Sequence, residues 1–482
     1  MFLHPLSTLV LVTHWLIVSV LFARVIMKRL PVGVSLAWLA VIASAPFVGA
    51  ALYLLMAERR LGRQRAACIA SNTDKILQWQ SALREHTDLA ACQIDPLADP
   101  IRLQADHVLG FSASAGNSIE LLDDSESVFD ALIADIDSAQ SRCHMCFYIW
   151  HEGGRATDVI NALIRAAHRG VECRALADAF GSKTFLGGAL ARRLRDAGVE
   201  FAAALPTELK RAFFVRRDLR NHRKIVVIDD RIAYSGSLNL VDPQFFKQGA
   251  GVGKWVDAIM RITGPAAAAL DGVFALDWAI ETGGSCDLHM GDSDREPSHI
   301  GSVVQVVPSG PGLRPDAIHQ LLLTAIYAAR RELVLTTPYF VPDDAILTAL
   351  MSAALRGVEV TLIVPVRSDS LLIRYASVAH FDELMSAGVN IARFEGGLLH
   401  TKSLTIDGVM SIFGSVNLDM RSLWLNFEIS LFVYDAAFTK RLKDLQNQYL
   451  SKTTLLDLEE WRRRPASRRF VENSFRLLGP LL

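Results

Sequence analysis

The sequence has a net charge of only −1, and it lacks both a cysteine pattern for metal binding and basic residues at its N-terminus. It has 50 lysines and arginines against 51 aspartates and glutamates, so no overall positive charge draws the chain to nucleic acid. Among the six cysteines, Cys143 and Cys146 form a single C-x-x-C, without the second pair that a zinc site needs. These absences argue against a nucleic-acid-binding or zinc protein and indicate free thiols in a reducing compartment.

Two uncharged apolar stretches near the N-terminus are predicted to cross a membrane. Residues 6–22 precede the first cation, Arg24. A cleaved signal peptide begins with a basic segment, so an anchor is the better interpretation. Residues 31–56 carry no charge and would form a helix of about 39 Å, longer than the roughly 30 Å of hydrocarbon. Pro46 is expected to kink this second helix.

The cations around these stretches favour a cytoplasmic catalytic part, because the more basic side of a membrane protein faces the cytoplasm. The cations are Arg24, Lys28 and Arg29 between the two stretches, and Arg59, Arg60, Arg63 and Arg65 after the second.

The rest of the chain contains an internal repeat. Residues 162–172 resemble 349–359, and the tripeptide 197–199 recurs at 387–389. The strongest match is H-x-K-x4-D followed by Gly-Ser-x-Asn, which occurs twice with one common offset. The motif residues are His222, Lys224 and Asp229 in the first copy, and His400, Lys402 and Asp407 in the second.

Each copy reads as strand, helix, strand, helix and hairpin. Strands are predicted at 143–150, 172–177, 332–339 and 359–365, and helices at 156–168 and 344–355. This alternation predicts an α/β fold of two homologous α/β/α sandwich units related by a pseudo-twofold axis. The expected organisation is a membrane anchor at 1–65, a linker at 66–105, the first unit at 106–285, a linker at 286–298 and the second unit at 299–482.

The motifs are predicted to lie on hairpins that turn at residues 229–230 and 407–408. Two-residue turns would place His222 opposite Ser237, and His400 opposite Ser415. Each histidine shares its strand face with the lysine two residues on. Two such half-sites would hold one phosphate between two histidines, with lysine charges and serine and asparagine donors around it. The expected phosphate-binding residues are Ser237, Asn239, Ser415 and Asn417.

The aspartates of the motifs do not fit this site. Asp229 and Asp407 each lie seven residues after a histidine, which is roughly 23 Å along a strand. They are therefore expected to form the turns or to support the site rather than to touch the phosphate.

The paired motifs resemble the phospholipase D superfamily, whose catalytic motif comprises all six H-x-K-x4-D residues. From about residue 35 to the C-terminus the chain is also similar to bacterial cardiolipin synthases. The segments that carry this similarity are 38–65, 147–150, 221–224, 337–340, 421–422, 426–428 and 461–482.

The resemblance implies a phosphatidyl transfer in two steps. His222 would attack the phosphorus of phosphatidylglycerol, and His400 would protonate the departing glycerol. A second phosphatidylglycerol would then attack the phosphohistidine to give cardiolipin. No cofactor or metal is implied, because lysines supply the positive charge. Asp257 and Glu428 either orient the imidazoles or are ordinary strand-edge carboxylates.

The resemblance also implies a multi-pass protein of the bacterial inner membrane, with phosphatidylglycerol and membrane lipids as its partners. The segment Lys210 to Arg217 mixes cations with aromatic residues, so it is predicted to contact lipid headgroups. A C-terminal cluster of arginines is predicted to be a solvated face. Its members are Arg462, Arg463, Arg464, Arg468 and Arg469.

Other functions stay open at this point. A phospholipase D hydrolase, or a synthase that takes phosphatidylethanolamine as donor, would use the same residues. A nuclease or phosphodiesterase is disfavoured by the near-zero charge. A non-catalytic scaffold is disfavoured because both motifs are intact.

Overall fold

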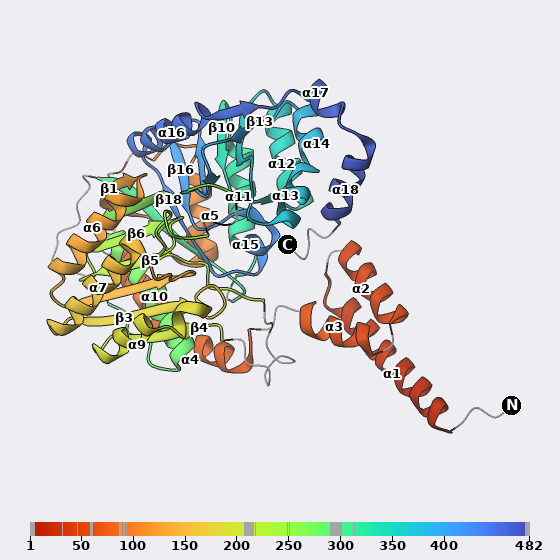
Figure 1. The fold of residues 1–482 in the computed structure, drawn as a ribbon, viewed down its shortest axis with the longest axis horizontal. Coiled ribbons are helices and arrows are strands. Elements are labelled where there is room, and N and C mark those ends of the chain that lie inside the picture. The colour runs from red at the N-terminus through yellow and green to blue at the C-terminus, as the bar shows by residue number, and fades with distance from the viewer. Residues whose placement is uncertain are drawn as a thin grey trace. The chain divides into compact units, whose positions relative to one another are not determined.

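The computed structural model describes residues 5–30, 32–45, 47–57, 61–85, 89, 92, 94–206, 216, 218–247, 249, 251–289, 301–312 and 314–477 (Figure 1). The chain forms two units, one of residues 1–66 and 207–219 and one of residues 67–206 and 220–482. Three predictions lie wholly or mostly outside the described residues: the kink at Pro46, the lipid contact of the segment from Lys210, and the linker at 286–298.

The N-terminal unit contains one helix long and apolar enough to cross a membrane. The apolar part of α1 (Pro5–Met27) spans Ser7–Met27. The second predicted span is not one helix, because α2 (Val32–Ser44) and α3 (Val48–Met56) have 13 and 9 residues and each falls short of the roughly 20 residues that a crossing needs. Phe47 takes a positive φ of 59°, which ends the helical path between them. A second membrane span is therefore not confirmed among the described residues.

The second unit alternates helices and strands. Its helices are α4 (Arg63–Glu85), α5 (Asp99–Leu109), α6 (Ser125–Ser138), α7 (Gly154–His168), α8 (Lys183–Leu186), α9 (Ala189–Asp196), α10 (Pro265–Thr282), α11 (Ala317–Ala328), α12 (Asp344–Leu355), α13 (Leu371–Val378), α14 (Phe381–Ser386), α15 (Met420–Trp424), α16 (Ala436–Leu450), α17 (Leu458–Arg462) and α18 (Ala466–Arg476).

Its strands are β1 (Ser114–Leu122), β2 (Arg142–Phe147), β3 (Glu172–Asp178), β4 (Glu200–Ala204), β5 (Ile225–Ile228), β6 (Ile232–Gly236), β7 (Trp255–Val256), β8 (Ile259–Thr263), β9 (Ser302–Ser309), β10 (Glu332–Thr336), β11 (Phe340–Val341), β12 (Glu359–Pro365), β13 (Asn390–Phe394), β14 (Leu398–Leu399), β15 (Ser403–Ile406), β16 (Met410–Gly414), β17 (Leu418–Asp419), β18 (Glu428–Val433) and β19 (Thr453–Leu455).

The order of strands in the main sheet is nearly symmetric about its middle. Its order is β19-β13-β12-β10-β15-β16-β18-β9-β1-β8-β6-β5-β2-β3-β4. The antiparallel pair β9–β1 lies in the middle, and from it the strands of the two copies follow in the same order toward each edge. In each half three neighbouring strands are parallel, β2–β3–β4 and β10–β12–β13. A duplicated unit explains this order.

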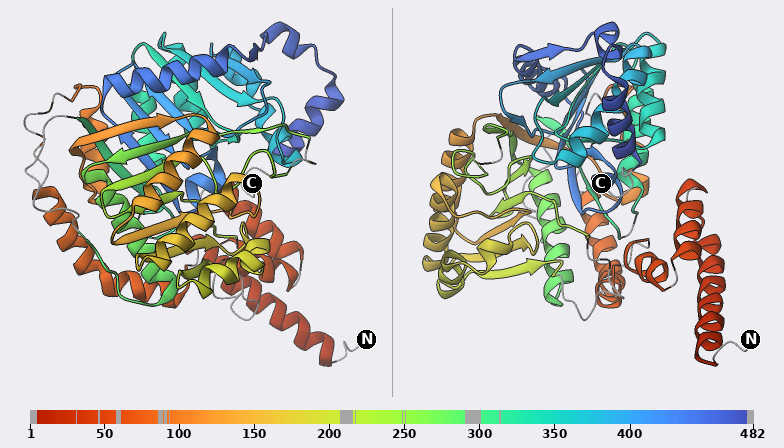
Figure 2. Two further views of the ribbon diagram at one scale, coloured as in Figure 1. Left: turned by 60° about the vertical axis from the view of Figure 1, so that its left-hand side comes forward. Right: turned by 45° about the vertical axis from the view of Figure 1, so that its right-hand side comes forward.

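Helices cover the sheet on both faces (Figure 2). One apolar cluster packs α6, α7 and α9 on the first half, and another packs α5, α11, α12 and α14 on the second. A third cluster lies under α10 and α16 and includes strand residues of both halves. The two halves are joined by this shared core as well as by the β1–β9 ladder.

The sequence located these elements well. The predicted helix at 344–355 and strand at 359–365 match α12 and β12 residue for residue, and β2, β3, β10 and α7 lie within three residues of their predicted ends. The expected linker at 66–105 contains most of α4 and the first part of α5, from Asp99 to Ala105. Ile101 and Ala105 of α5 are fully buried, so this segment is part of the core.

The glycines of the two Gly-Ser-x-Asn segments allow neighbouring strands to approach closely. A Cβ at Gly414 would lie 2.3 Å from the Ile429 carbonyl oxygen, and one at Gly236 would lie 2.6 Å from the Ala258 oxygen. A side chain at either position would push β18 or β8, and the residues next to them, out of place.

We therefore expect Gly414→Ala to lower the free energy of unfolding by about 1–3 kcal/mol, the usual range for forcing extra atoms into a packed core. Gly187→Ala is the matched control, because its Cβ would meet nothing nearer than 4.0 Å. Denaturant unfolding of both variants measures the difference. Equal stabilities would contradict the close approach.

Candidate active site

The two motif hairpins form as predicted, but their register differs by one residue. Ile228 pairs with Ile232, and the second hairpin repeats this pairing, so three residues rather than two separate the paired positions. Asp229 and Asp230 both take a positive φ and the Arg231 N–H closes the turn onto the Ile228 oxygen at 3.1 Å, which leaves the third residue as an unpaired bulge.

The predicted pairings of His222 with Ser237 and of His400 with Ser415 were therefore wrong. A slip of one residue turns side chains to the other face of a strand. Moreover, neither histidine lies in a hairpin strand, since β5 begins at Ile225 and β15 at Ser403.

Each histidine instead lies in a short segment that pairs with the other half of the molecule. Asn221 forms a bridge with Phe427, and the His222 N–H donates to the Phe427 oxygen at 2.8 Å. In the other copy β14 pairs with β7, and the His400 N–H donates to the Val256 oxygen at 2.8 Å. The two backbone bonds fix each imidazole against the opposite half.

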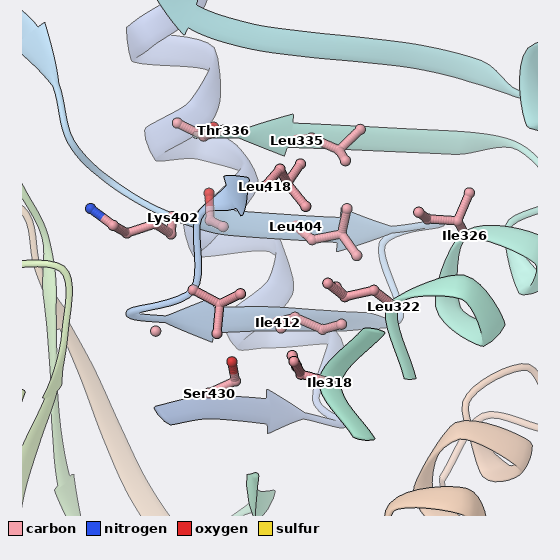
Figure 3. Close-up of a pocket in the computed structure, with 13 residues that line it drawn as sticks. Ile318, Leu322, Ile326, Leu335, Thr336, Lys402, Leu404, Ile412, Leu418 and Ser430 are labelled. Atoms are coloured by element: carbon pink, nitrogen blue, oxygen red, sulfur yellow. The ribbon is translucent and has the colours of Figure 1, made fainter. Parts of the chain in front are cut away.

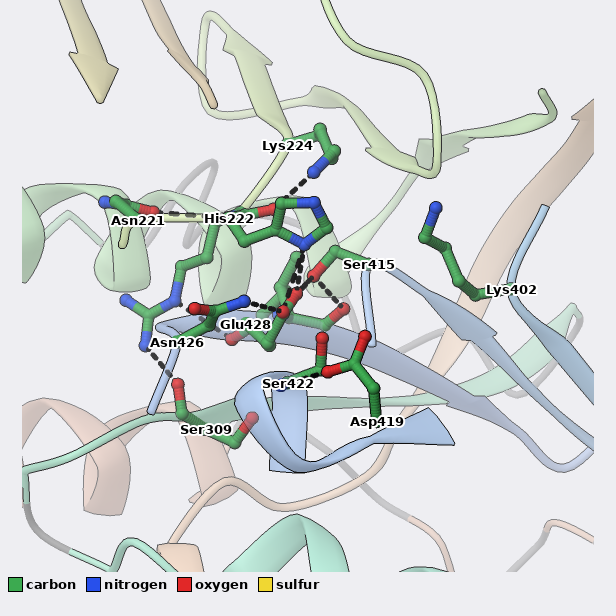
Figure 4. Close-up of polar contacts among 12 residues, drawn as sticks. Asn221, His222, Lys224, Ser309, Lys402, Ser415, Asp419, Ser422, Asn426 and Glu428 are labelled. Carbon is green, nitrogen blue, oxygen red and sulfur yellow. Dashed lines mark hydrogen bonds and ion pairs between the residues drawn. The ribbon is translucent and has the colours of Figure 1, made fainter. Parts of the chain in front are cut away.

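The carboxylate that holds each imidazole also comes from the opposite half. His222 Nδ1 lies 2.8 and 3.0 Å from the two oxygens of Glu428, the first residue of β18 (Figure 4). His400 Nδ1 lies 2.6 Å from Oδ1 of Asp257, the residue after β7. Each imidazole thus has a carboxylate of the other half on its Nδ1, and neither half-site is complete without the other half of the chain.

The serines bind these carboxylates. The Ser415 hydroxyl donates to Glu428 at 2.5 Å and the Ser237 hydroxyl donates to Asp257 at 2.7 Å. Both serines are fully buried, and a hydroxyl has a single proton to donate. Their predicted role as donors to a phosphate therefore does not fit this geometry. Asn426 supplies a further donor to Glu428 at 3.1 Å.

The two lysines are buried beside the histidines. Lys224 Nζ donates to the His222 carbonyl oxygen at 2.6 Å, and Lys402 Nζ donates to the His400 oxygen at 2.6 Å. Figure 4 shows the contact of Lys224 with His222. Burial lowers the pKa of Lys224 to about 8 and that of Lys402 to about 7, against the partial opposition of Asp257 and Glu428.

Electrostatics keep the imidazoles neutral and the carboxylates ionised. Burial and the two lysines lower the pKa of His222 to about 4, although Glu428 opposes the shift. The pKa of His400 is lowered for the same reasons. Burial raises the pKa of Asp257, but His400, Lys402 and Ser237 outweigh it and hold the value at about 2. A neutral imidazole that donates its Nδ1 proton to a carboxylate has a free lone pair on Nε2.

The two asparagines that follow the serines differ in the hydrogen-bond partners of their side-chain oxygens. Asn239 Oδ1 accepts the Ile149 N–H at 3.2 Å. Asn417 Oδ1 is buried and has no hydrogen-bond partner among the described residues. Donation from either amide to a bound phosphate stays a prediction.

The motif aspartates lie at the far ends of the hairpins and hold backbone there. Asp229 accepts the N–H groups of residues 140–142, and Asp407 those of residues 330–332, at 2.8–3.0 Å. Both therefore fix the start of β2 or β10, as the strand arithmetic indicated. Their place in the catalytic motif reflects the fold rather than contact with the histidines.

Aromatic residues near the imidazoles were not identified as site residues from the sequence. The Tyr148 ring lies edge-on to His222 with 5.1 Å between centroids, and the Trp255 ring lies 4.6 Å from His400. Tyr148 belongs to the segment 147–150, whose residue types marked the family resemblance, and Trp255 lies two residues before Asp257; these were the available signals. Arg223, paired with Asp277 at 2.5 Å, lies between the motif histidine and lysine and was also missed.

A small apolar pocket lies behind Lys402. It has a volume of about 30 Å³ and is lined by residues of α11, β10, β15, β16 and β18 (Figure 3). This is about the volume of one water molecule, so the pocket is too small for any part of a lipid beyond a few atoms. It places the stem of Lys402 in apolar surroundings. Among the described residues no group of three or more His, Cys, Asp or Glu is placed to hold a metal ion.

Comparison with known proteins agrees with this geometry. The family model described as "Cardiolipin synthase, PLD-like domain" matches residues 132–269 and 322–449, one match in each half. The chain belongs to this family. It is 44% identical over 483 residues to cardiolipin synthase A of Yersinia pseudotuberculosis serotype O:1b, covering 100% of this chain and 99% of that one, and matches cardiolipin synthase A of Yersinia pestis equally.

A solved structure extends the likeness to the fold. The phosphatidylserine synthase of Haemophilus influenzae Rd KW20 superposes with a TM-score of 0.60, covering 79% of this chain and 100% of that chain at 16% identity. The duplicated cardiolipin synthase fold of this chain is thus shared by a protein of very different sequence.

We expect Asp407→Ala to lower the free energy of unfolding by about 1.5–3 kcal/mol, because it removes a charged acceptor from three backbone N–H groups, and to leave turnover per folded molecule within a few-fold. Denaturant unfolding and activity assays on the same preparation test this. Asp444→Ala, an exposed partner of Lys440, is the control and should change stability by less than about 0.5 kcal/mol. Unchanged stability with a hundred-fold loss of turnover would place Asp407 in the chemistry instead.

Proposed function

We propose that the protein is a cardiolipin synthase that transfers a phosphatidyl group from one phosphatidylglycerol to another through a phosphohistidine. The observation that carries the proposal is the exchanged pairing of each histidine with the carboxylate of the opposite half, His222 with Glu428 and His400 with Asp257. This pairing brings two imidazoles and two buried ammonium groups into one site, which suits the displacement of an alcohol from a phosphodiester.

In the first step His222 Nε2 attacks the phosphorus of phosphatidylglycerol. A nitrogen–phosphorus bond forms and the bond to the glycerol oxygen breaks. The negative charge of the bound phosphodiester favours uptake of a proton on His400 Nε2, and His400 gives that proton to the glycerol oxygen, so free glycerol leaves rather than an alkoxide. Glu428 accepts the Nδ1 proton of neutral His222, which leaves the lone pair on Nε2 free for the attack.

In the second step the hydroxyl of another phosphatidylglycerol attacks the phosphorus. Its proton passes to His400 Nε2, the nitrogen–phosphorus bond breaks, and cardiolipin leaves with His222 restored. Protons balance over the cycle, because the proton that His400 gives in the first step returns in the second.

Lys224 and Lys402 stabilise the charge that develops on the phosphoryl oxygens. An ammonium group that is fully buried interacts strongly with an anion because little water screens it. The same burial lowers the pKa of both lysines, and an arriving phosphodiester anion raises it again by favouring the charged form.

Two features support His400 as the residue that carries the proton. The Asp257 contact is the shorter one, at 2.6 Å, and Asp257 accepts from one other side chain, Ser237, while its Oδ2 has no hydrogen-bond partner among the described residues. The charge of Glu428 is divided among His222, Ser415 and Asn426. A carboxylate with fewer competing donors stabilises an imidazolium more.

We further infer that the two copies, 106–285 and 299–482, are the functional halves of the enzyme, and that residues 1–65 anchor it to the bacterial inner membrane with the catalytic unit in the cytoplasm. The apolar length of α1 and the basic residues that follow the apolar stretches support this arrangement.

The direct test supplies phosphatidylglycerol as the only lipid in mixed micelles and resolves the products by mass spectrometry. Cardiolipin and glycerol should appear in equal amounts. His222→Ala and His400→Ala should each lose turnover by at least about a thousand-fold, as expected when a covalent or acid–base group is removed. His168→Ala, an exposed histidine at the end of α7, should retain wild-type turnover.

Other products would indicate a different reaction or a different lipid donor. Phosphatidic acid in place of cardiolipin would make the protein a hydrolase, and turnover that begins only when phosphatidylethanolamine is added would identify a different donor. Near wild-type turnover in either site variant would overturn the two-histidine mechanism.

The lysines predict an alkaline limit to activity. Because their charged forms bind the phosphate and their pKa values are lowered to about 8 and about 7, kcat/KM should fall as the pH rises through this range. In Lys402→Arg the guanidinium stays charged, so the fall that remains should shift upward toward the Lys224 value even if the rate is lower. A pH profile with the same alkaline limit in both proteins would assign that limit to another group.

A further inference from the structure

His222 lies between two residues whose side chains bind the same carboxylate. Asp277 of α10 contacts the Arg223 guanidinium through Oδ1 at 2.5 Å and accepts from the Asn221 amide through Oδ2 at 3.2 Å. The Asn221 side-chain oxygen in turn accepts the Arg223 N–H at 3.2 Å. All four residues are buried, and so is most of α10. The backbone that carries the His222 ring is therefore held on both sides against one helix of its own half.

The same guanidinium holds the backbone of Glu428, the carboxylate partner of His222. Arg223 Nε donates to the Glu428 carbonyl oxygen at 3.0 Å, and Nη2 donates to the Ser309 carbonyl oxygen at 3.2 Å. Glu428 and Ser309 are paired at the end of the β9–β18 ladder. A planar guanidinium presents five N–H donors in a fixed fork, so it can bind these two carbonyls and a carboxylate at once. Arg223 thus fixes both members of the His222–Glu428 pair.

The second copy does not repeat this arrangement. Where Arg223 follows the histidine in the first copy, Thr401 follows it in the second, and its hydroxyl lies 3.0 Å from that of Tyr449 on α16. The residue before the second histidine is Leu399, whose side chain has no donor or acceptor. Hydrogen bonds with an ionised partner are about twice as strong as neutral ones. The side chains next to the two histidines therefore hold them with different strength.

We propose that Arg223 and Asp277 form a positioning pair that aligns His222 for attack on phosphorus and sets it apart from His400. The proposal rests on the proposed function, in which His222 is the nucleophile. Arg223 acts through Glu428 and the backbone of His222 and not through the substrate. Alignment matters because a displacement of about 1 Å at a reacting atom can lower a rate about a hundred-fold.

The test measures formation of the phosphohistidine in the full-length chain with His400→Ala, in mixed micelles with phosphatidyl-p-nitrophenol. Attack by His222 Nε2 forms the nitrogen–phosphorus bond and breaks the bond to nitrophenolate, which leaves without a proton. The adduct accumulates because the second step lacks its base. The amplitude of the nitrophenol burst counts the competent molecules, and the rate constant of the burst reports how well the nucleophile is aligned.

The parent protein with His400→Ala separates this proposal from the one it rests on. Mass spectrometry should find its adduct on the peptide that contains His222. An adduct on another residue would overturn the proposed nucleophile, and the positioning pair with it, before any change is made at Arg223.

Arg223→Ala and Arg223→Lys should keep most of the burst amplitude and lower its rate constant by about a hundred-fold. The lipid concentration that gives half the maximal rate should stay within a few-fold, because neither residue binds lipid. Tyr449→Phe is the matched control in the other copy. It should change the rate constant by no more than a few-fold, because it removes a neutral contact.

A cavity beside the pair allows the missing group to be supplied from solution. It has a volume of about 350 Å³ and its lining includes Arg223, Asp277 and Ser309. Leu77 of the same lining is 57% exposed, so the cavity reaches the surface. Guanidinium, at a concentration too low to unfold the protein, should raise the rate constant of Arg223→Ala at least about ten-fold, whereas methylammonium, which lacks the planar fork, should raise it little.

The burst separates positioning from folding. Loss of amplitude with an unchanged rate constant in both Arg223 variants would mean that the pair only stabilises the fold, and would overturn the positioning role. Rate constants within a few-fold of the parent would overturn it as well. A slow burst that guanidinium does not accelerate, or an equal loss in Tyr449→Phe, would contradict the assignment of the effect to this pair.

Discussion

Two buried histidine–carboxylate pairs form the centre of the site, and each pair joins one half of the chain to the other. His222 with Glu428 and His400 with Asp257 bring four ionisable groups out of water beside Lys224 and Lys402. Removing one partner of such a pair typically costs about 3–5 kcal/mol, because the other charge is left unpaired. The site therefore requires both halves, and the β1–β9 ladder and shared core that join them are a condition of its formation.

The burial that makes this arrangement costly also suits it to phosphoryl transfer. Removal from water favours neutral imidazoles and lowers the pKa of both lysines. An entering phosphodiester anion reverses that balance, since it restores the charged state of the lysines and favours a proton on His400. Exclusion of water therefore favours the neutral imidazoles, and the negative charge of the bound substrate favours the charged lysines and the proton on His400.

The sequence identified the site's main members but not how they meet. The repeated histidines and lysines and the α/β alternation were recognisable from spacing and residue type. Asp257 and Glu428 were named as carboxylates that either orient the imidazoles or lie at strand edges. The exchange of carboxylates between halves depends on the order of strands in the sheet, which joins positions 206 and 143 residues apart, and no local pattern records it. The serine positions were misread because one bulged residue, Arg231 in the first hairpin, shifts the register. Hydropathy along residues 31–56 does not report where α2 ends and α3 begins, so it could not establish a second crossing helix.

The claim that His222 is the nucleophile and His400 its acid can be tested directly with a substrate whose leaving group needs no protonation, such as phosphatidyl-p-nitrophenol. In His400→Ala, nitrophenol should be released in a burst equal to the enzyme concentration, and mass spectrometry should find the phosphatidyl group on the peptide that contains His222, because the base for the second step is gone. His222→Ala should give no burst. A burst in His222→Ala with the adduct on His400, or no covalent adduct in either variant, would contradict the account.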